Sequence, residues 1–165
     1  MKSTLSLDSM HLPTPLGDML LAATHQGLAG LWFVGQKHFP DTTGWRNNPN
    51  HPVLKQTAQQ VLEYMRGQRQ NFDLPLDLSH GTAFQQSVWH ALLRIGRGHT
   101  VGYGALAAQL HNPQAVRAVG AAVGRNPISI IVPCHRVVGK DGSLTGYAGG
   151  LERKSALWQL EGAMI

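Results

Sequence analysis

The one cysteine of the chain, Cys134, is followed directly by His135 and Arg136 in the stretch Val-Pro-Cys-His-Arg-Val-Val-Gly. A thiol attacks as its thiolate, and a free cysteine with a pKa of about 8.5 is only a few per cent ionised at neutral pH. A base or a cation beside the sulfur raises that fraction, and this stretch supplies one of each. The residue types and their spacing therefore indicate a nucleophilic cysteine.

A buried structural cysteine is the alternative, because a lone cysteine is more often a small hydrophobic residue than a catalyst. The apolar run of residues 128–132 predicts a buried strand that Pro133 ends, which would present the thiol at the end of a rigid element. Adjacent strand residues point to opposite faces, so His135 reaches Cys134 only if the chain turns here or a water bridges them. The tripeptide alone leaves both interpretations open.

Composition bounds the kind of protein. With 165 residues, of which 42% are hydrophobic and 14% charged, the chain can form one or two small domains with a buried core. A single cysteine excludes an internal disulfide and is typical of a reducing cytoplasm. The N-terminal residues lack the apolar core of a signal peptide, and no apolar run approaches membrane-spanning length. We therefore expect a cytoplasmic protein with no membrane partner.

The charge is unevenly distributed along the chain. Lysine and arginine balance aspartate and glutamate in residues 1–80, so the whole net charge of +5 lies in residues 81–165 together with the cysteine. A basic segment with few acidic residues indicates a polyanion as partner. Small basic proteins that bind no polyanion are common, so charge alone favours nucleic acid only slightly.

The first half of the chain predicts an antiparallel β-meander followed by a helix. Turn signals separate three strands, a loop that Trp45 anchors comes next, and the helix ends before Gly67. The expected elements are strands at residues 5–12, 18–23 and 28–34, a loop at 36–52, a helix at 51–66 and an extended segment at 71–78. The boundary of this small α/β domain is expected at residues 79–81.

The second half predicts mainly helices. Thr82 caps a helix that runs to about residue 95, and a short helix at 103–110 is followed by Asn112 as N-cap and Pro113 at the first helical position. A short helix, a tight turn and a second helix at 114–123 form a helix-turn-helix. The remaining expected elements are strands at 128–132 and 137–138, a hairpin-type turn at 139–142, a glycine-rich loop at 144–150 and a helix at 151–161.

The second helix of this motif carries almost only alanine and glycine on its exposed sides, with Arg117 and Arg125 as its charges. Reading bases in the major groove requires Arg, Asn, Gln or Glu side chains on the exposed face. A smooth helix instead suits close approach to the backbone in the minor groove. Packing against a neighbouring helix would explain the small residues equally well.

The Pro-Cys-His-Arg core, with Asn-Pro-Ile-Ser-Ile-Ile before it and Gly-Tyr-Ala-Gly-Gly-Leu-Glu-Arg-Lys after it, closely resembles the O6-alkylguanine-DNA alkyltransferase family. The similarity runs from about Thr82 to the C-terminus, is weaker before that, and is greatest to the bacterial Ogt-type methylated-DNA–protein-cysteine methyltransferases. It implies an α+β fold with two domains. Residues 1–80 would form a ribonuclease H-like supporting domain, and residues 81–165 a winged helix-turn-helix domain that binds DNA and accepts the alkyl group.

The resemblance also implies a catalytic set. Cys134 corresponds to the alkyl acceptor, and His135 to the base that removes the thiol proton through a water. Glu161 would orient His135, which repeats the nucleophile, base and orienting group of hydrolytic triads. Asn126 corresponds to a hinge between the helix-turn-helix and the cysteine segment.

A second set, by the same resemblance, handles the base. Tyr103 corresponds to a tyrosine that donates to the guanine ring and clashes with the 3′ phosphate, and Arg117 to an arginine that fills the vacated stack. Val137, Tyr147 and Ala148 would line the base pocket, the first and third through their backbone groups. Some relatives have proline where this chain has Ser129, so the tolerated size of the alkyl group stays open.

The implied activity is direct reversal of DNA damage, with one irreversible transfer from O6-alkylguanine to Cys134. The base must leave the stack, which costs a few kcal/mol. The thioether product is not hydrolysed, so the protein acts once and needs no cofactor. We expect a monomer that binds double-stranded DNA in the minor groove regardless of sequence. Activity on O4-methylthymine and cooperative binding stay open.

No metal site is expected. Some relatives hold zinc with cysteines, which a chain with Cys134 alone cannot do, and the nine histidines lack metal-ligand spacing. Two other functions compete with the transferase. A helix-turn-helix regulator with a structural cysteine would leave a footprint at one defined operator. The absence of base-reading side chains disfavours this function. A cysteine hydrolase would turn over an ester or amide many times.

Overall fold

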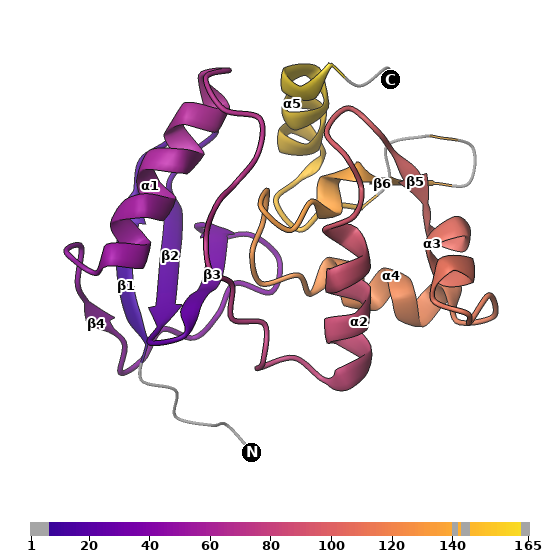
Figure 1. Cartoon of the computed structure of the whole chain (residues 1–165), viewed down its shortest axis with the longest axis horizontal. Helices are drawn as coiled ribbons and strands as arrows, with labels where there is room; N and C mark the ends of the chain where they lie inside the picture. Colours follow the sequence, from indigo (N-terminus) through magenta and orange to yellow (C-terminus); the bar gives the residue numbers. More distant parts are fainter. Residues whose placement is uncertain (1–6, 140–141, 143–145, 163–165) are drawn as a thin grey trace. The chain divides into compact units, whose positions relative to one another are not determined.

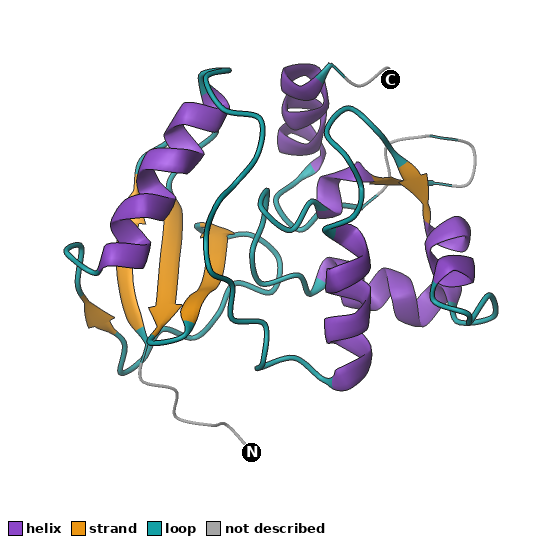
Figure 2. Cartoon of the chain, viewed as in Figure 1, coloured by secondary structure: helices purple, strands orange, loops and turns teal. Residues whose placement is uncertain are grey.

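A computed structural model describes residues 7–139, 142 and 146–162 (Figure 1). The chain divides into two compact units, Met1–Leu78 and Ser79–Ile165. The first combines a sheet with one helix and the second is mainly helical (Figure 2), which confirms the predicted α+β class. In the described part of the chain, no helix is both long and apolar enough to cross a membrane.

A four-stranded sheet forms the core of the first unit. Its order is β3-β2-β1-β4, in which β2 pairs antiparallel with both β1 and β3, and β4 pairs parallel with β1. All of β3 and nearly all of β2 is buried, because packed residues cover both faces of these strands. The strands are β1 (Asp8–Leu12), β2 (Met19–Thr24), β3 (Gly27–Phe33) and β4 (Arg46–Asn47).

Helix α1 (Pro52–Met65) packs against β1, β2 and β3 (Figure 1). The imidazole of His51 accepts a hydrogen bond from the Val53 amide at 3.2 Å, and Pro52 fills the first turn, where no amide partner is needed. The spacing of the apolar residues places one face inward, as the sequence predicts. Its buried residues are Leu54, Thr57, Gln60, Val61 and Tyr64.

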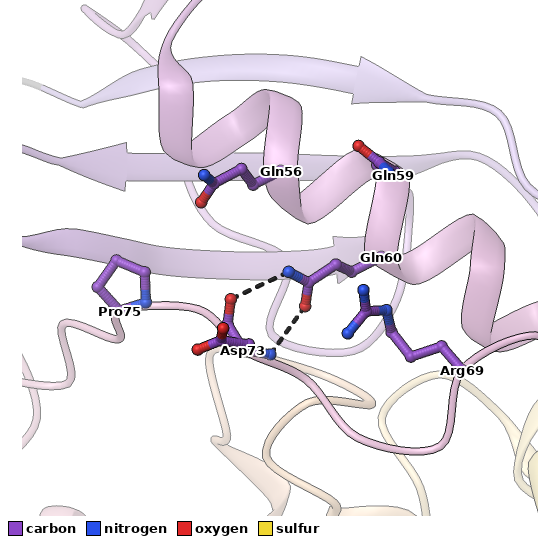
Figure 3. A pocket seen from close by; sticks show the side chains of 6 residues that line it. All are labelled: Gln56, Gln59, Gln60, Arg69, Asp73 and Pro75. Atoms are coloured by element: carbon purple, nitrogen blue, oxygen red, sulfur yellow. Dashed lines mark hydrogen bonds between the residues drawn. The ribbon is translucent and has the colours of Figure 1, made fainter.

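The segment that follows α1 returns along β3. The Leu28 amide donates to the Pro75 carbonyl at 2.8 Å, and the Asp77 amide donates to the Leu28 carbonyl at 2.7 Å. Figure 3 shows a polar pocket between this segment and α1, where the Gln60 side chain exchanges two hydrogen bonds, of 3.0 and 2.9 Å, with the backbone of Asp73. These two hydrogen bonds therefore join α1 to the segment after it.

Residues 36–52, predicted as loop only, contain strand β4. Arg46 donates to both carboxylate oxygens of Asp8, at 3.0 and 2.9 Å, and Asn48 adds a third bond at 3.0 Å. These hydrogen bonds, from Arg46 above all, lower the pKa of Asp8. The Trp45 ring lies 5.8 Å from that of Trp32, which confirms Trp45 as the anchor of this segment.

Four α-helices lie in the described residues of the second unit, and three of them, α2 (Ala83–Leu92), α3 (Tyr103–Gln109) and α4 (Val116–Gly124), pack together. Helix α2 begins with a capping box, in which the Thr82 hydroxyl and the Gln85 side chain each accept from the other residue's backbone amide. Helix α4 packs on both α2 and α3, and the Trp89 indole donates to the Ala122 carbonyl at 2.8 Å. The elements after α2 are β5 (Val101–Gly102), α3 (Tyr103–Gln109), α4 (Val116–Gly124), the 3₁₀ turn η1 (Cys134–Arg136), β6 (Val137–Val138) and α5 (Leu151–Glu161).

Two predicted helix ends are wrong. Helix α2 ends at Leu92 rather than near residue 95, since the next residues close 3₁₀-type bonds before a glycine pair. Helix α4 starts at Val116 rather than residue 114, and Asn112 does not cap it. The Asn112 carbonyl accepts from the Ala115 amide at 3.0 Å in a separate turn, so Ala115 is the N-cap.

The strand predicted at residues 128–132 is also wrong. The Ile131 amide donates to the Ser129 carbonyl and the Val132 amide to the Ile128 carbonyl, while Ile130 has a φ of +72°, so the segment folds back on itself. Sheet pairing begins only with β6, which runs parallel to β5. Lys140, Asp141 and residues 143–145 of the predicted turn and loop lie outside the described residues, as do residues 5–6 of the first predicted strand.

Candidate active site

The thiol of Cys134 lies at the first residue of η1, directly after the folded-back segment. The Asn126 side chain holds that segment, donating to the Val132 carbonyl at 2.7 Å and accepting from the Ile128 amide at 3.0 Å. Asn126 is itself buried. Its two hydrogen bonds therefore help to fix the path of the chain from α4 to the cysteine.

Cys134 is only 6% exposed, and this burial raises the pKa of its thiol to about 11. A hydrogen bond from Asn126 and the positive charge of Lys154 act in the opposite direction but do not offset the burial. The resting thiol is therefore protonated at neutral pH. The tripeptide did not predict this, since it shows the neighbouring base and cation but not the burial.

His135 lies next to the cysteine in the same turn and is fully buried. Its Nε2 lies 2.9 Å from the Oε2 atom of Glu161, and its Nδ1 has no hydrogen-bond partner among the described residues. Burial lowers the pKa of His135 despite the adjacent carboxylate. A neutral imidazole that donates from Nε2 to Glu161 leaves Nδ1 free to accept a proton.

Glu161 is the last residue of α5, and Arg136 holds its carboxylate at two points. Arg136 Nε donates to Oε1 at 3.0 Å and Nη2 to Oε2 at 2.8 Å, a bidentate pair. Arg136 Nη1 also donates to the Ile95 carbonyl. The buried carboxylate is thus paired with a cation and a histidine, which a buried charge requires.

Lys154 on α5 belongs to the site although the sequence did not single it out. Its ammonium is buried and donates to the Val137 carbonyl at 2.6 Å and the Gly146 carbonyl at 3.2 Å. Burial lowers the pKa of Lys154 to about 8. The lysine thereby links β6 to the segment 146–150, and the Val137 carbonyl keeps a second lone pair for another donor.

Tyr103, at the first residue of α3, lies beside this segment. A Cβ built on Gly146 would lie 3.8 Å from the Tyr103 hydroxyl, and one built on Gly120 of α4 would lie 3.8 Å from the tyrosine ring. Tyr147 and Ala148 are partly buried in the next two positions. Arg117 is an exposed side chain on α4. The structure thus brings Cys134, His135, Glu161 and Asn126 together, and Tyr103 close to the segment of Tyr147 and Ala148.

The described residues contain no group of three or more His, Cys, Asp or Glu side chains that could hold a metal ion.

Comparisons with known proteins match both units to one protein family. The family model of the 6-O-methylguanine DNA methyltransferase, ribonuclease-like domain, matches residues 10–78, and that of the DNA binding domain of the same family matches residues 83–163. A relative from Mycolicibacterium paratuberculosis, named methylated-DNA–protein-cysteine methyltransferase, is 46% identical over 148 residues, which are 90% of this chain and 88% of the relative. A relative of the same name from Haemophilus influenzae is 43% identical over 152 residues, which are 92% of this chain and 84% of the relative.

The crystal structure of Mycobacterium tuberculosis OGT in complex with DNA superposes with a TM-score of 0.88 at 44% identity, covering 94% of this chain and 93% of that chain. These similarities extend over both units and confirm the resemblance carried by the residues around Cys134. The chain belongs to the 6-O-methylguanine DNA methyltransferase family.

Proposed function

We propose that this protein repairs alkylated DNA by transferring the methyl group of O6-methylguanine to Cys134. The observation that carries the proposal is a buried thiol beside a His135–Glu161 pair, on a chain of this family. The S–CH₃ bond forms as the CH₃–O6 bond breaks, and guanine leaves with the electron pair of that bond. The thiol proton departs through His135 and guanine takes up one proton, so the overall charge does not change.

The proton path follows from the two nitrogens of His135. Because the thiol is protonated at rest, attack requires a base. A water between Sγ of Cys134 and Nδ1 of His135 would pass the proton to the imidazole. Glu161 orients the ring through Nε2 and stabilises the imidazolium as it forms. The thioether product cannot be hydrolysed under these conditions, so each protein molecule reacts once.

The DNA-binding surface in this proposal is the helix-turn-helix of α3 and α4. The exposed face of α4 carries alanine and glycine with Arg117 and Arg125, which suits the minor groove and offers little for reading a sequence. The damaged base leaves the stack and enters a pocket lined by the Val137 carbonyl, Tyr147 and Ala148, with Tyr103 beside it. The relative solved with DNA and the positive charge of residues 81–165 support this partner.

The two parts of the chain have different roles in the proposal. Residues 81–165 form the domain that binds DNA and accepts the alkyl group, and residues 1–80 form a supporting domain. The protein works as a monomer. It needs no cofactor, because the cysteine itself is the co-substrate. A thiol that must stay reduced fits the cytoplasm.

Intact mass spectrometry tests this function. After incubation with duplex DNA that holds O6-methylguanine, we expect the mass of the protein to rise by one methyl group, and peptide mapping to place the group on Cys134. Methyl release with repeated turnover, or a methyl group on another residue, would exclude the proposed transfer.

Arg117→Ala is expected to slow repair of duplex DNA by about tenfold, because the vacated stack stays unfilled and flipping costs more. Reaction with free O6-benzylguanine, which needs no flipping, should stay within about twofold of the unchanged protein. The measurement is the rate of Cys134 alkylation with each substrate. Arg94→Ala is the matched control, since Arg94 is an exposed arginine outside α3 and α4. Equal losses on both substrates would contradict an intercalating role for Arg117.

A further inference from the structure

We propose that Arg97, in the segment between α2 and β5, positions Glu161 by binding the carboxyl end of α5. The inference rests on the proposed function, in which Glu161 orients His135. Arg97 touches neither the thiol nor the imidazole through any contact described above. It would act on the reaction through the end of the helix that carries Glu161.

The last turn of α5 needs partners from outside the helix, because the final four carbonyls of a helix have none within it. Gly162, in the left-handed region at a φ of +75°, donates its amide toward the carbonyls of Trp158 and Gln159. The Leu160 carbonyl accepts from Arg97 Nη2 at 2.8 Å. Arg97 thus binds the carbonyl immediately before Glu161.

The segment around Arg97 contacts the same helix end at two further points. Gly98 has a φ of +79°, and a Cβ built on it would lie 3.2 Å from the Glu161 carbonyl oxygen, so a larger residue there would crowd the end of α5. The Ile95 carbonyl accepts from Arg136, the residue that also binds the Glu161 carboxylate. Residues 95–98 therefore hold both the main chain of Glu161 and the cation that pairs with its side chain.

The charges at the end of α5 favour the contact with the Arg97 guanidinium. A carboxylate at the last position of a helix is opposed by the negative end of the helix dipole, and a guanidinium there is favourable. Arg97 therefore offsets part of the cost of placing Glu161 at the end of α5. If Arg97 is lost, the last turn gains freedom to fray, and the 2.9 Å contact between Glu161 and His135 loses its fixed geometry.

The test compares rates of Cys134 alkylation, followed by intact mass, with methylated duplex DNA and with iodoacetamide. Arg97→Met keeps the side-chain length and removes the donors, and Arg97→Lys returns one donor and the charge. Arg94→Met is the matched control, because Arg94 is an exposed arginine three residues earlier. His135→Gln provides a background in which the base that Glu161 orients is already lost. Thermal unfolding and DNA affinity are measured for every variant.

We expect Arg97→Met to slow both reactions by about tenfold, as loss of a supporting hydrogen bond around a reactive group commonly does. Arg97→Lys should recover most of the rate, and Arg94→Met should stay within about twofold of the unchanged protein. In the His135→Gln background, Arg97→Met should cause no further loss, because residues that act as a unit are not additive. DNA affinity should not change.

An Arg97→Met rate within about twofold of the unchanged protein, or a full additional loss in the His135→Gln background, would overturn the inference. The two substrates separate it from the proposed function. If the protein takes no methyl group from DNA while the iodoacetamide rates follow the expected pattern, the proposed function fails and the role of Arg97 stands. If methyl transfer proceeds and Arg97→Met has no effect on either rate, the proposed function stands and the role of Arg97 fails.

Discussion

Cys134→Ala is expected to abolish methyl transfer from O6-methylguanine while leaving the affinity for duplex DNA within about twofold of that of the unchanged protein. Cys134 is the only thiol of the chain, so no other residue can form the stable thioether. It is buried in the turn after Pro133, whereas the proposed DNA contacts lie on α3 and α4. The measurements are intact mass after incubation with methylated duplex DNA, and titration of labelled duplex in a binding assay.

Cys134→Ser is the second variant for this prediction, because it keeps the shape and polarity of the side chain. An alcohol is far harder to ionise than a thiol, so the serine variant should be as inactive as the alanine one. Thermal unfolding of both variants shows that the fold is retained. Methyl transfer by either variant would refute Cys134 as the acceptor, and loss of DNA binding in both would show that the cysteine has a structural role instead.

The sequence predicted the elements whose signals are local. Helix α1 is recognisable from its apolar spacing and the glycine after it, and α2 from the capping box of Thr82 and Gln85. The turns Pro-Thr-Pro-Leu-Gly and Thr-His-Gln-Gly separate the first three strands, and the predicted ends of β2 and β3 lie within one residue of their actual ends. These features depend on neighbours in the chain, which a single sequence contains.

The segment before the cysteine shows where local signals fail. A short apolar run has the same pattern in a buried strand and in a buried loop, and residues 128–132 form the loop. The Asn126 side chain favours the loop over the strand. It gives the backbone of residues 128–132 a hydrogen-bond donor and an acceptor, which a neighbouring strand would otherwise provide. The chain then turns at Cys134 in η1, which is one of the two routes, a turn or a bridging water, by which His135 could reach the thiol.

Lys154, Arg136 and Arg97 show a second limit. Arg136 is recognisable in the sequence as a cation beside the thiol, but not as the partner of Glu161. No pattern connects Lys154 to Val137, or Arg97 to Leu160. These contacts join positions far apart in the chain, so only the folded structure reveals them. The family resemblance implied that Cys134, His135 and Glu161 act as a set, but it did not imply the cations that contact Glu161 and the Val137 carbonyl.

The burial of the thiol also changes what the site needs for reaction. With a thiol pKa of about 11, the thiolate fraction at neutral pH is very small, so an exposed, already ionised cysteine does not describe the resting protein. Burial slows the reaction of the sulfur with oxidants and small alkylating agents, and it makes deprotonation of the thiol depend on His135. The site is therefore expected to depend strongly on its base.

His135→Gln is expected to slow methyl transfer by about a hundredfold or more at neutral pH, the range that general bases contribute. Glutamine can still donate to Glu161 but cannot accept the thiol proton. The rates are measured by quenched-flow or manual sampling with intact mass, on methylated duplex DNA. His90→Gln is the matched control, since His90 is an exposed histidine on α2, and its rate should match that of the unchanged protein.

The dependence on pH separates a base from a structural histidine. In the unchanged protein the rate should fall only as the pH drops through the pKa of His135, which burial holds below its usual value, because the imidazolium cannot accept a proton. In His135→Gln the thiol must ionise unaided, so the rate should rise about tenfold for each pH unit toward the thiol pKa. If both proteins instead show parallel pH profiles that differ only in height, His135 holds the fold of the turn and does not remove the proton.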